Sequence, residues 1–126
     1  MYNETTCRFA KTHEWACAED GVAAVGISDY AQKEISDIVF VELPKVGAQV
    51  EQGKPCAVIE SVKAAADFFA PVSGEVIEVN GAIVDNPALV NQSPHGEGWF
   101  CKLRMSKPAE LEGLMEFGEY KRSIGV

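Results

Sequence analysis

The sequence predicts a mainly β fold with short helices, and three features support this. Short apolar segments recur along the chain, and Gly, Pro, Asn or Asp residues separate them. The Asp20-Gly21 step between two of these segments is a strong β-hairpin signal. Helical spacing of apolar residues is confined to short stretches. With 126 residues, 47% of them hydrophobic, the chain suits a single domain spanning residues 1–126.

The first elements are a hairpin and a helix. Residues 15–18 and 22–27 flank the Asp20-Gly21 turn and form the expected hairpin. Residues 28–35 then change to helical spacing, and Ser28 is the candidate N-cap of a short helix. The segment that follows, 37–43, returns to strand composition.

The later elements are again mostly strands. Further strands are expected at residues 57–60, 68–69, 74–79 and 99–104. The pattern places Phe40, Val41 and Val76 in the core. Residues 106–115 predict a C-terminal helix, because Pro108 suits its first turn and an apolar face recurs at helical spacing. The tail, residues 121–126, carries little information.

The charge and hydropathy of the chain exclude two classes of protein. A formal net charge of -8, from 19 acidic and 11 basic residues, repels nucleic-acid phosphates. No apolar run reaches the length of a membrane span. The N-terminus resembles neither a secretory signal nor a transit peptide. We therefore expect a cytoplasmic protein in a bacterium, or a mitochondrial matrix protein if the chain is a mature eukaryotic one.

The four cysteines do not predict a metal or disulfide site. Cys7, Cys17, Cys56 and Cys101 form no C-x-x-C pair, and the two histidines complete no zinc spacing. A chain of this size can build a core without disulfides. We therefore expect four separate buried or half-buried thiols, in a reducing compartment.

One lysine stands out near the middle of the chain. Lys63 lies in a run of small residues, roughly midway between two similar segments, 47–52 and 81–86. These segments share a glycine, an alanine and a valine, followed by an acid and an amide. Two similar β-halves would place Lys63 at the tip of a central hairpin. A lone lysine in such a turn is otherwise an ordinary solvated residue.

The residues around this lysine match a known motif. Glu60-Ser61-Val62-Lys63-Ala64-Ala65 resembles the lipoyl-attachment motif of the glycine cleavage H-protein family. A biotin domain, by contrast, places its lysine between methionines. Other blocks resemble the same family in the same order: His13-Glu14-Trp15 and residues 25–27, 31–32, 39–44, 70–76, 89–91 and 96–99. The lipoyl domains of 2-oxoacid dehydrogenases are shorter and lack the first block and the terminal helix.

The resemblance implies a fold and a role. The fold would be a barrel-sandwich hybrid of the lipoyl and biotinyl type, with short edge helices including a C-terminal one. Lys63 would carry lipoic acid as N6-lipoyllysine, attached by a lipoate ligase or a lipoyl/octanoyl transferase. The protein would be a non-catalytic carrier with no metal site. It would take an aminomethyl group from glycine decarboxylase (P protein) to the tetrahydrofolate-dependent aminomethyltransferase (T protein), and electrons to dihydrolipoyl dehydrogenase (L protein).

The resemblance also implies roles for four more residues. A hydroxyl and two acids of the family line a cleft for the loaded arm, and the matching positions are Thr12, Glu14 and Asp67. Carboxylates would hold the cationic amine by charge-assisted hydrogen bonds and shield the adjacent carbon. Glu60 is implied in recognition by the lipoylating enzyme. All four residues also suit an ordinary solvated surface.

Some positions depart from the family pattern, and two alternatives stay open. Ala66 stands where serine or threonine is common, Ser28 where threonine is common, and residues 92–95 where an acid, proline and tyrosine often occur. An H-like scaffold that relays lipoyl groups in protein lipoylation needs the same modified Lys63. An independent enzyme or unmodified module is the other alternative, but the chain has no phosphate loop and no convincing nucleophile–base spacing.

Overall fold

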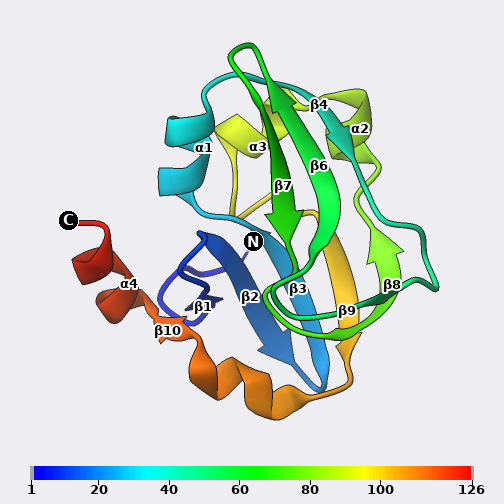
Figure 1. Ribbon diagram of the computed structural model, residues 1–126, viewed down its shortest axis with the longest axis vertical. Coiled ribbons are helices and arrows are strands. Elements are labelled where there is room, and N and C mark those ends of the chain that lie inside the picture. The colour runs from blue at the N-terminus through cyan, green and yellow to red at the C-terminus, as the bar shows by residue number, and fades with distance from the viewer. Residues whose placement is uncertain (1, 126) are drawn as a thin grey trace.

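The computed structural model describes residues 2–125 and contains two β-sheets packed around a main apolar core (Figure 1). The strands are β1 Arg8–Phe9, β2 Glu14–Glu19, β3 Val22–Ile27, β4 Ile38–Glu42, β5 Gln49–Val50, β6 Pro55–Ser61, β7 Ala65–Phe69, β8 Gly74–Val79, β9 Cys101–Met105 and β10 Met115–Glu116. One sheet has seven strands in the order β10-β1-β2-β3-β9-β8-β5, and the other has three in the order β4-β6-β7. This arrangement confirms the mainly β prediction.

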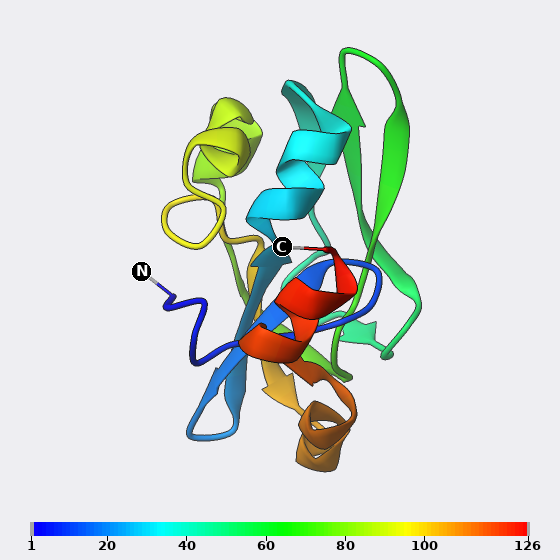
Figure 2. The same cartoon turned by 90° about the vertical axis from the view of Figure 1, so that its left-hand side faces the viewer.

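Short helices lie at the edges of the sheets (Figure 2). They are α1 Asp29–Ile35, α2 Ala82–Asp85, α3 Ala88–Gln92, the 3₁₀-helix η1 Pro108–Gly113 and α4 Phe117–Ser123. Ser28 caps α1 as predicted, because its hydroxyl accepts the N–H of Ala31 at 3.1 Å. No helix among the described residues has the length and apolar character needed to cross a membrane.

The first hairpin forms where the sequence predicts it. Strands β2 and β3 pair antiparallel up to Glu19 and Val22. Both turn residues have positive φ, 53° for Asp20 and 81° for Gly21. A two-residue turn of this kind matches the right-handed twist of the paired strands, which is why Asp-Gly favours it.

The main core lies between the two sheets, and one expected core residue is outside it. Val41 and Val76 are 2% and 0% exposed, as predicted, but Phe40 is 44% exposed. The pairing of β4 with β6 shifts between Ile38 and Phe40. This bulge leaves both Val39 and Phe40 exposed, because an extra residue interrupts the alternation of the strand.

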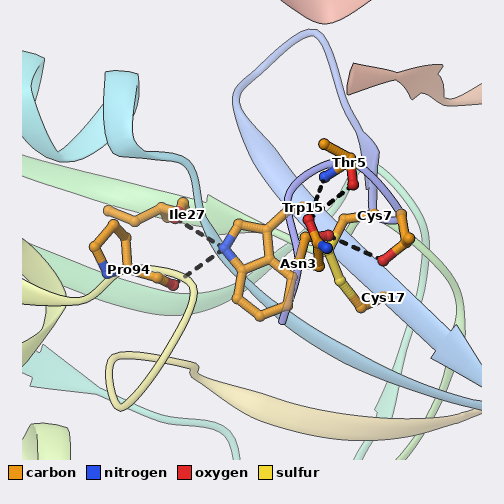
Figure 3. Close-up of a disulfide and its surroundings, with 8 residues drawn as sticks. Asn3, Thr5, Cys7, Trp15, Cys17, Ile27 and Pro94 are labelled. Carbon is orange, nitrogen blue, oxygen red and sulfur yellow. Dashed lines mark hydrogen bonds between the residues drawn. A yellow bond between two sulfur atoms is a disulfide. The ribbon is translucent and has the colours of Figure 1, made fainter. Parts of the chain in front are cut away.

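A second cluster of buried side chains covers the outer face of the seven-stranded sheet. It contains Cys7, Phe9, Trp15, Ala24 and Tyr120. The indole N–H of Trp15 donates to the carbonyls of Ile27, at 2.9 Å, and Pro94, at 3.2 Å (Figure 3). The ring occupies the space above Gly26, where an added Cβ would come within 2.6 Å of the Trp15 ring. Glycine is therefore required there.

The expectation of four separate thiols is wrong in the structure, because Cys7 and Cys17 form a disulfide (Figure 3). Strand β1 pairs with β2 so that Arg8 faces Ala16. Cys7 and Cys17, one step further out, then face each other with their Cα atoms 4.4 Å apart. The sequence analysis missed this pairing because β1 is only two residues long and was not predicted. Cys56 and Cys101 are free thiols, as expected.

The C-terminal region differs from the expected single helix over residues 106–115. Residues Pro108–Gly113 form a 3₁₀-helix, and Leu114 is extended, with φ -89° and ψ 158°. Met115 then pairs with Phe9 in β10. The C-terminal α-helix is α4, which extends into residues 121–123 of the tail, a segment whose sequence carried little information. Pairing with a distant strand therefore overrides the local helical spacing.

The two similar segments do not form similar structures. Residues 47–52 contain a turn and strand β5, whereas residues 81–86 form helix α2. Gly47 has a φ of 93°, and Gly81 has an ordinary helical φ of -61°. The predicted pseudo-symmetry of these segments is therefore wrong.

Candidate functional site

Lys63 lies in the turn between β6 and β7, a hairpin that projects beyond the rest of the molecule (Figure 1). The last pair of the ladder is Glu60 with Ala65. The N–H of Ser61 donates to the carbonyl of Ala64 at 2.8 Å. The Ser61 hydroxyl accepts the N–H groups of Lys63, at 3.2 Å, and Ala64, at 3.1 Å. Backbone groups and one serine thus close the turn without the lysine side chain.

The side chain of Lys63 is available for modification. The residue is exposed, and within residues 2–125 no hydrogen bond or ion pair joins its ammonium group to another side chain. Its neighbours Ala64 and Ala65 are exposed and small, so they leave space around the tip. Val62 is the one large neighbour, and it is 66% exposed.

Glu14 is a buried carboxylate that joins the two sheets. It lies on β2 and is 3% exposed. One oxygen accepts the hydroxyl of Thr12, and the other accepts the backbone N–H of Phe69 on β7 at 3.3 Å. Burial raises the pKa of the Glu14 carboxyl, and the bonds from Thr12 and Phe69 oppose that rise. The structure therefore brings Thr12 and Glu14 together at the end of β7.

A mainly apolar cleft of about 540 Å³ opens beside this carboxylate. It lies between the β1–β2 corner, the β5–β6 turn, the end of β7 and the η1–β10 segment. The side chains that line it include Thr12, Gln52, Phe69, Leu114 and Met115. Such a cleft suits an apolar chain with a small polar end, because its walls are apolar and its polar groups are few.

The remaining two site candidates are exposed residues of the hairpin. Asp67 lies on β7 opposite Val58, and Glu60 lies on β6 opposite both Phe40 and Ala65. Asp67 and Phe69 share one face of the strand and are separated by about 7 Å along it. Asp67 does not line the cleft, so the structure places it between the lysine and the cleft rather than beside Glu14.

A polar network behind the site ties α4 to the strand that carries Glu14. The hydroxyl of Tyr120 lies 2.8 Å from Nδ1 of His13 and 2.7 Å from the hydroxyl of Ser28. His13 has a φ of 82° and immediately precedes Glu14. Burial lowers the pKa of His13, which favours the neutral ring, and Glu34 opposes that shift. Burial also raises the pKa of the Tyr120 hydroxyl.

The free thiols near this region are poor nucleophiles. Burial raises the pKa of Cys56 to about 12, and the nearby Glu14 carboxylate adds to the shift. Burial likewise raises the pKa of Cys101 well above its usual range. A thiol reacts through its thiolate, so the raised pKa values disfavour the reactive form of both side chains near neutral pH.

Several contributors to the site had no sequence signal. The Phe69 amide, Gln52 and Leu114 reach the cleft only because distant segments meet there. The network partner Tyr120 lies on α4, between the helix expected over residues 106–115 and the tail, in a stretch for which no element was predicted. His13, by contrast, belongs to the family-like block His13-Glu14-Trp15, which could have identified it.

Comparisons with known proteins agree on one family. The family model described as "Glycine cleavage H-protein" matches residues 7–125. The chain is 53% identical to a glycine cleavage system H protein of Xanthobacter autotrophicus over 117 residues, covering 93% of this chain and 94% of that protein. It is 49% identical to a probable glycine cleavage system H protein of Aeropyrum pernix, covering 93% of this chain and 82% of that one.

A solved structure of a glycine cleavage system H protein has a similar fold. The structure of a glycine cleavage system H protein from Mycobacterium marinum superposes with a TM-score of 0.90 at 34% identity. The match covers 97% of this chain and 98% of that one. The predicted barrel-sandwich fold, with short edge helices and a C-terminal helix, is confirmed.

Proposed function

The chain belongs to the glycine cleavage H-protein family, and we propose from this that it is a lipoyl-bearing carrier with lipoic acid attached to Lys63. The observation that carries the proposal is the exposed lysine in a turn that closes without it. An enzyme that acylates this lysine can approach the tip without disturbing the core. Glu60, exposed beside the turn, is the residue we assign to recognition by that enzyme.

The residues of this chain fit a lipoyl group. Small exposed alanines follow Lys63, so the hairpin does not crowd a long acyl chain. The cleft beside Thr12 offers apolar walls for such a chain when it folds back. When attached, the group supplies a disulfide that accepts an aminomethyl group and electrons. The chemistry of transfer belongs to partner enzymes, and this chain supplies attachment and positioning.

The partners follow from the family and suit the charge of this chain. We propose glycine decarboxylase, aminomethyltransferase and dihydrolipoyl dehydrogenase as the enzymes that act in turn on the arm. A lipoate ligase or a lipoyl/octanoyl transferase would load Lys63. The net charge of -8 favours encounters with partners whose faces are basic, because complementary charges steer association.

We assign different roles to Asp67 and Glu14, because their burial differs. Asp67 is exposed, so we assign it to the cationic end of the loaded arm. Glu14 is buried and already accepts two hydrogen bonds, so we assign it a positioning role. It fixes the Thr12 hydroxyl and the end of β7 at the mouth of the cleft. Thr12, which lines the cleft with Lys11 and Gln52, remains the hydroxyl that we assign to bonding with the arm.

The proposal is tested by mapping the modification. The chain is expressed with a lipoate ligase and lipoate, and its intact mass and peptides are measured. One lipoyl group on Lys63 is expected. Lys63→Arg keeps the charge but removes the acyl acceptor, so it abolishes the increment. Lys54→Arg, on another exposed lysine, is the matched control and keeps it. Lipoylation that persists in Lys63→Arg would overturn the assignment.

A further inference from the structure

The outer face of the seven-stranded sheet carries a disulfide, Cys7–Cys17, which lies apart from the hairpin that holds Lys63. We propose that Cys7–Cys17 is a thiol–disulfide exchange site, at which small thiols attack Cys17 through a hollow beside it and release Cys7. The proposal does not depend on the function of Lys63. It rests on three observations: the bonded pair, the unequal exposure of the two cysteine residues, and the position of the hollow.

The two cysteines differ in access. Cys7 is 2% exposed and belongs to the second buried cluster, with Phe9 and Trp15. The N–H of Cys7 donates to the carbonyl of Asn3 at 3.2 Å, which holds Cys7 in the N-terminal turn. Cys17 is partly exposed and lines a hollow of about 240 Å³. A thiol in solution can therefore reach Cys17 but not Cys7.

The hollow also lies on the side of Cys17 from which attack must come. Across the sheet, Cys17 faces Ala24 on β3, and Ala24 faces Lys102 on β9. Cys7, on β1, is the neighbour of Cys17 on the opposite side. Thiol–disulfide exchange requires the incoming sulfur to approach opposite the sulfur that leaves. The hollow, which is lined by Cys17, Ala24 and Lys102, provides that approach, and Ala24 keeps it open because its side chain is a single methyl group.

Charges around the hollow are balanced. Lys102 and Glu19 both line it. The Lys102 ammonium lies 3.3 Å from Glu78 and 5.4 Å from the centre of the Trp99 ring. Neither sign dominates, so the hollow excludes neither neutral nor singly charged small thiols. Access, rather than charge, selects Cys17 as the reacting sulfur.

The exchange balances without any further reagent. A thiolate forms a bond to Cys17 Sγ while the Cys7–Cys17 bond breaks, and the electron pair stays on Cys7 Sγ, which takes a proton from solvent. Cys17 is then a mixed disulfide. A second thiolate attacks the external sulfur and releases the Cys17 thiolate, which is protonated in turn, so two small thiols are oxidised and one protein disulfide is reduced. A small disulfide such as oxidised glutathione reverses both steps.

The first experiment compares the two sulfurs singly. Cys7→Ser and Cys17→Ser are incubated with oxidised glutathione, and the mixed disulfide is followed by peptide mass mapping. We expect Cys17 in the first variant to react at least about tenfold faster than Cys7 in the second. The free thiols Cys56, which is partly exposed, and Cys101, which is buried, serve as internal references in the same digest. Equal rates, or a faster reaction at Cys7, would overturn the assignment of Cys17 as the attacked sulfur.

The second experiment tests the hollow. Ala24→Val narrows the approach and should slow reduction of the native disulfide by glutathione severalfold, while Ala82→Val on exposed α2 is the matched control and leaves the rate unchanged. Circular dichroism checks that both variants fold. If Ala24→Val is misfolded, the single-cysteine comparison decides instead. Reduction at an unchanged rate in folded Ala24→Val, or a native protein whose four cysteines stay thiols in oxidised glutathione, would overturn the proposal.

Discussion

The side chain of Glu14 on β2 accepts the backbone N–H of Phe69 on β7 at 3.3 Å, so a buried carboxylate links the seven-stranded sheet to the edge of the three-stranded one. An N–H at a strand edge needs a partner when it is covered by other parts of the chain. Glu14 supplies that partner, and Thr12 occupies its second oxygen. The link lies where the hairpin carrying Lys63 joins the body of the molecule.

Glu14→Gln should make the protein more stable relative to the wild type as the pH rises. Burial raises the folded-state pKa of Glu14, so above the unfolded value of about 4.5 its ionisation favours unfolding. Glutamine has no charge to bury, and its amide can accept from Phe69 and donate to Thr12. Thermal melts between pH 4 and pH 8 measure the difference in Tm. A difference that stays constant with pH would show that the charge has no such cost.

His95 should make the protein acid-sensitive. It is 7% exposed, its ring stacks on Trp15, and among the described residues neither ring nitrogen has a hydrogen-bond partner. Burial lowers its pKa to about 4 from the usual 6.5. Between those values the unfolded chain binds a proton and the folded chain does not, so stability is full above pH 6.5 and falls toward pH 4.

The expected size of this loss is on the order of 3 kcal/mol across the window. His95→Phe, which cannot bind a proton, should lose less stability between pH 7 and pH 4 than the wild type. Urea unfolding at four pH values in this range measures the difference. Parallel losses in the two proteins would mean that His95 is not the group responsible.

Lys63, the proposed attachment residue, should contribute little to folding. Lys63→Ala should change the free energy of unfolding by less than roughly 0.5 kcal/mol, because the turn closes without the side chain. Val76→Ala should cost about 2–4 kcal/mol, since Val76 is fully buried. Phe40→Ala should cost less than Val76→Ala, because Phe40 is 44% exposed on the bulge. Chemical denaturation that gives the reverse order would contradict this view of the core.

The hydroxyl of Tyr120 should stabilise the attachment of α4. Tyr120→Phe removes its contacts to Ser28 and His13 and should cost about 1–2 kcal/mol. Ser28→Ala also removes the cap of α1 and should cost about as much. The two residues touch, so the double variant should cost less than the sum of the single ones. Additive losses would show that the two hydroxyls do not act together.

Attachment of lipoic acid to Lys63 should slow amide hydrogen exchange at the cleft, because the acyl chain can fold back into it. We expect slower amide hydrogen exchange around Thr12 and Phe69 in the lipoylated chain than in the unmodified one. Residues around Ala82, on the exposed helix α2, are the internal control and should exchange equally in both forms. Equal exchange at the cleft would show that the arm remains in solvent.

Local signals accounted for much of the fold. The Asp20-Gly21 turn, the Ser28 cap and the strand around Val76 were visible because each depends on residues close in sequence. Strands β1, β5 and β10 were missed, since two-residue strands have no periodicity and form only when a distant partner is in place. The Cys7–Cys17 pair was missed for the same reason.

The candidate site likewise has one feature that the local sequence predicted and others that depend on tertiary packing. Lys63 was identified from its local motif, and the hairpin places it at an exposed tip. The burial of Glu14 and its bond to Phe69 depend on how two sheets pack, and the sequence pattern did not distinguish a buried acid from a solvated one. The bulge that turns Phe40 outward is likewise invisible to a rule of strict alternation.

The turn at residues 61–64, which forms without hydrogen bonds from the side chains of residues 62 and 63, also affects how this part of the chain can evolve. Its geometry depends on Ser61, on the backbone bond to Ala64 and on the N–H of Val62, which donates to the carbonyl of Asp37 at 3.0 Å. The side chains of residues 62 and 63 are exposed and contribute little to packing. Substitutions at position 62 should therefore change the free energy of unfolding very little. Under the proposed function, the enzyme that acylates Lys63 must bind this turn, so a substitution at position 62 should change recognition by that enzyme more than it changes the stability of the fold.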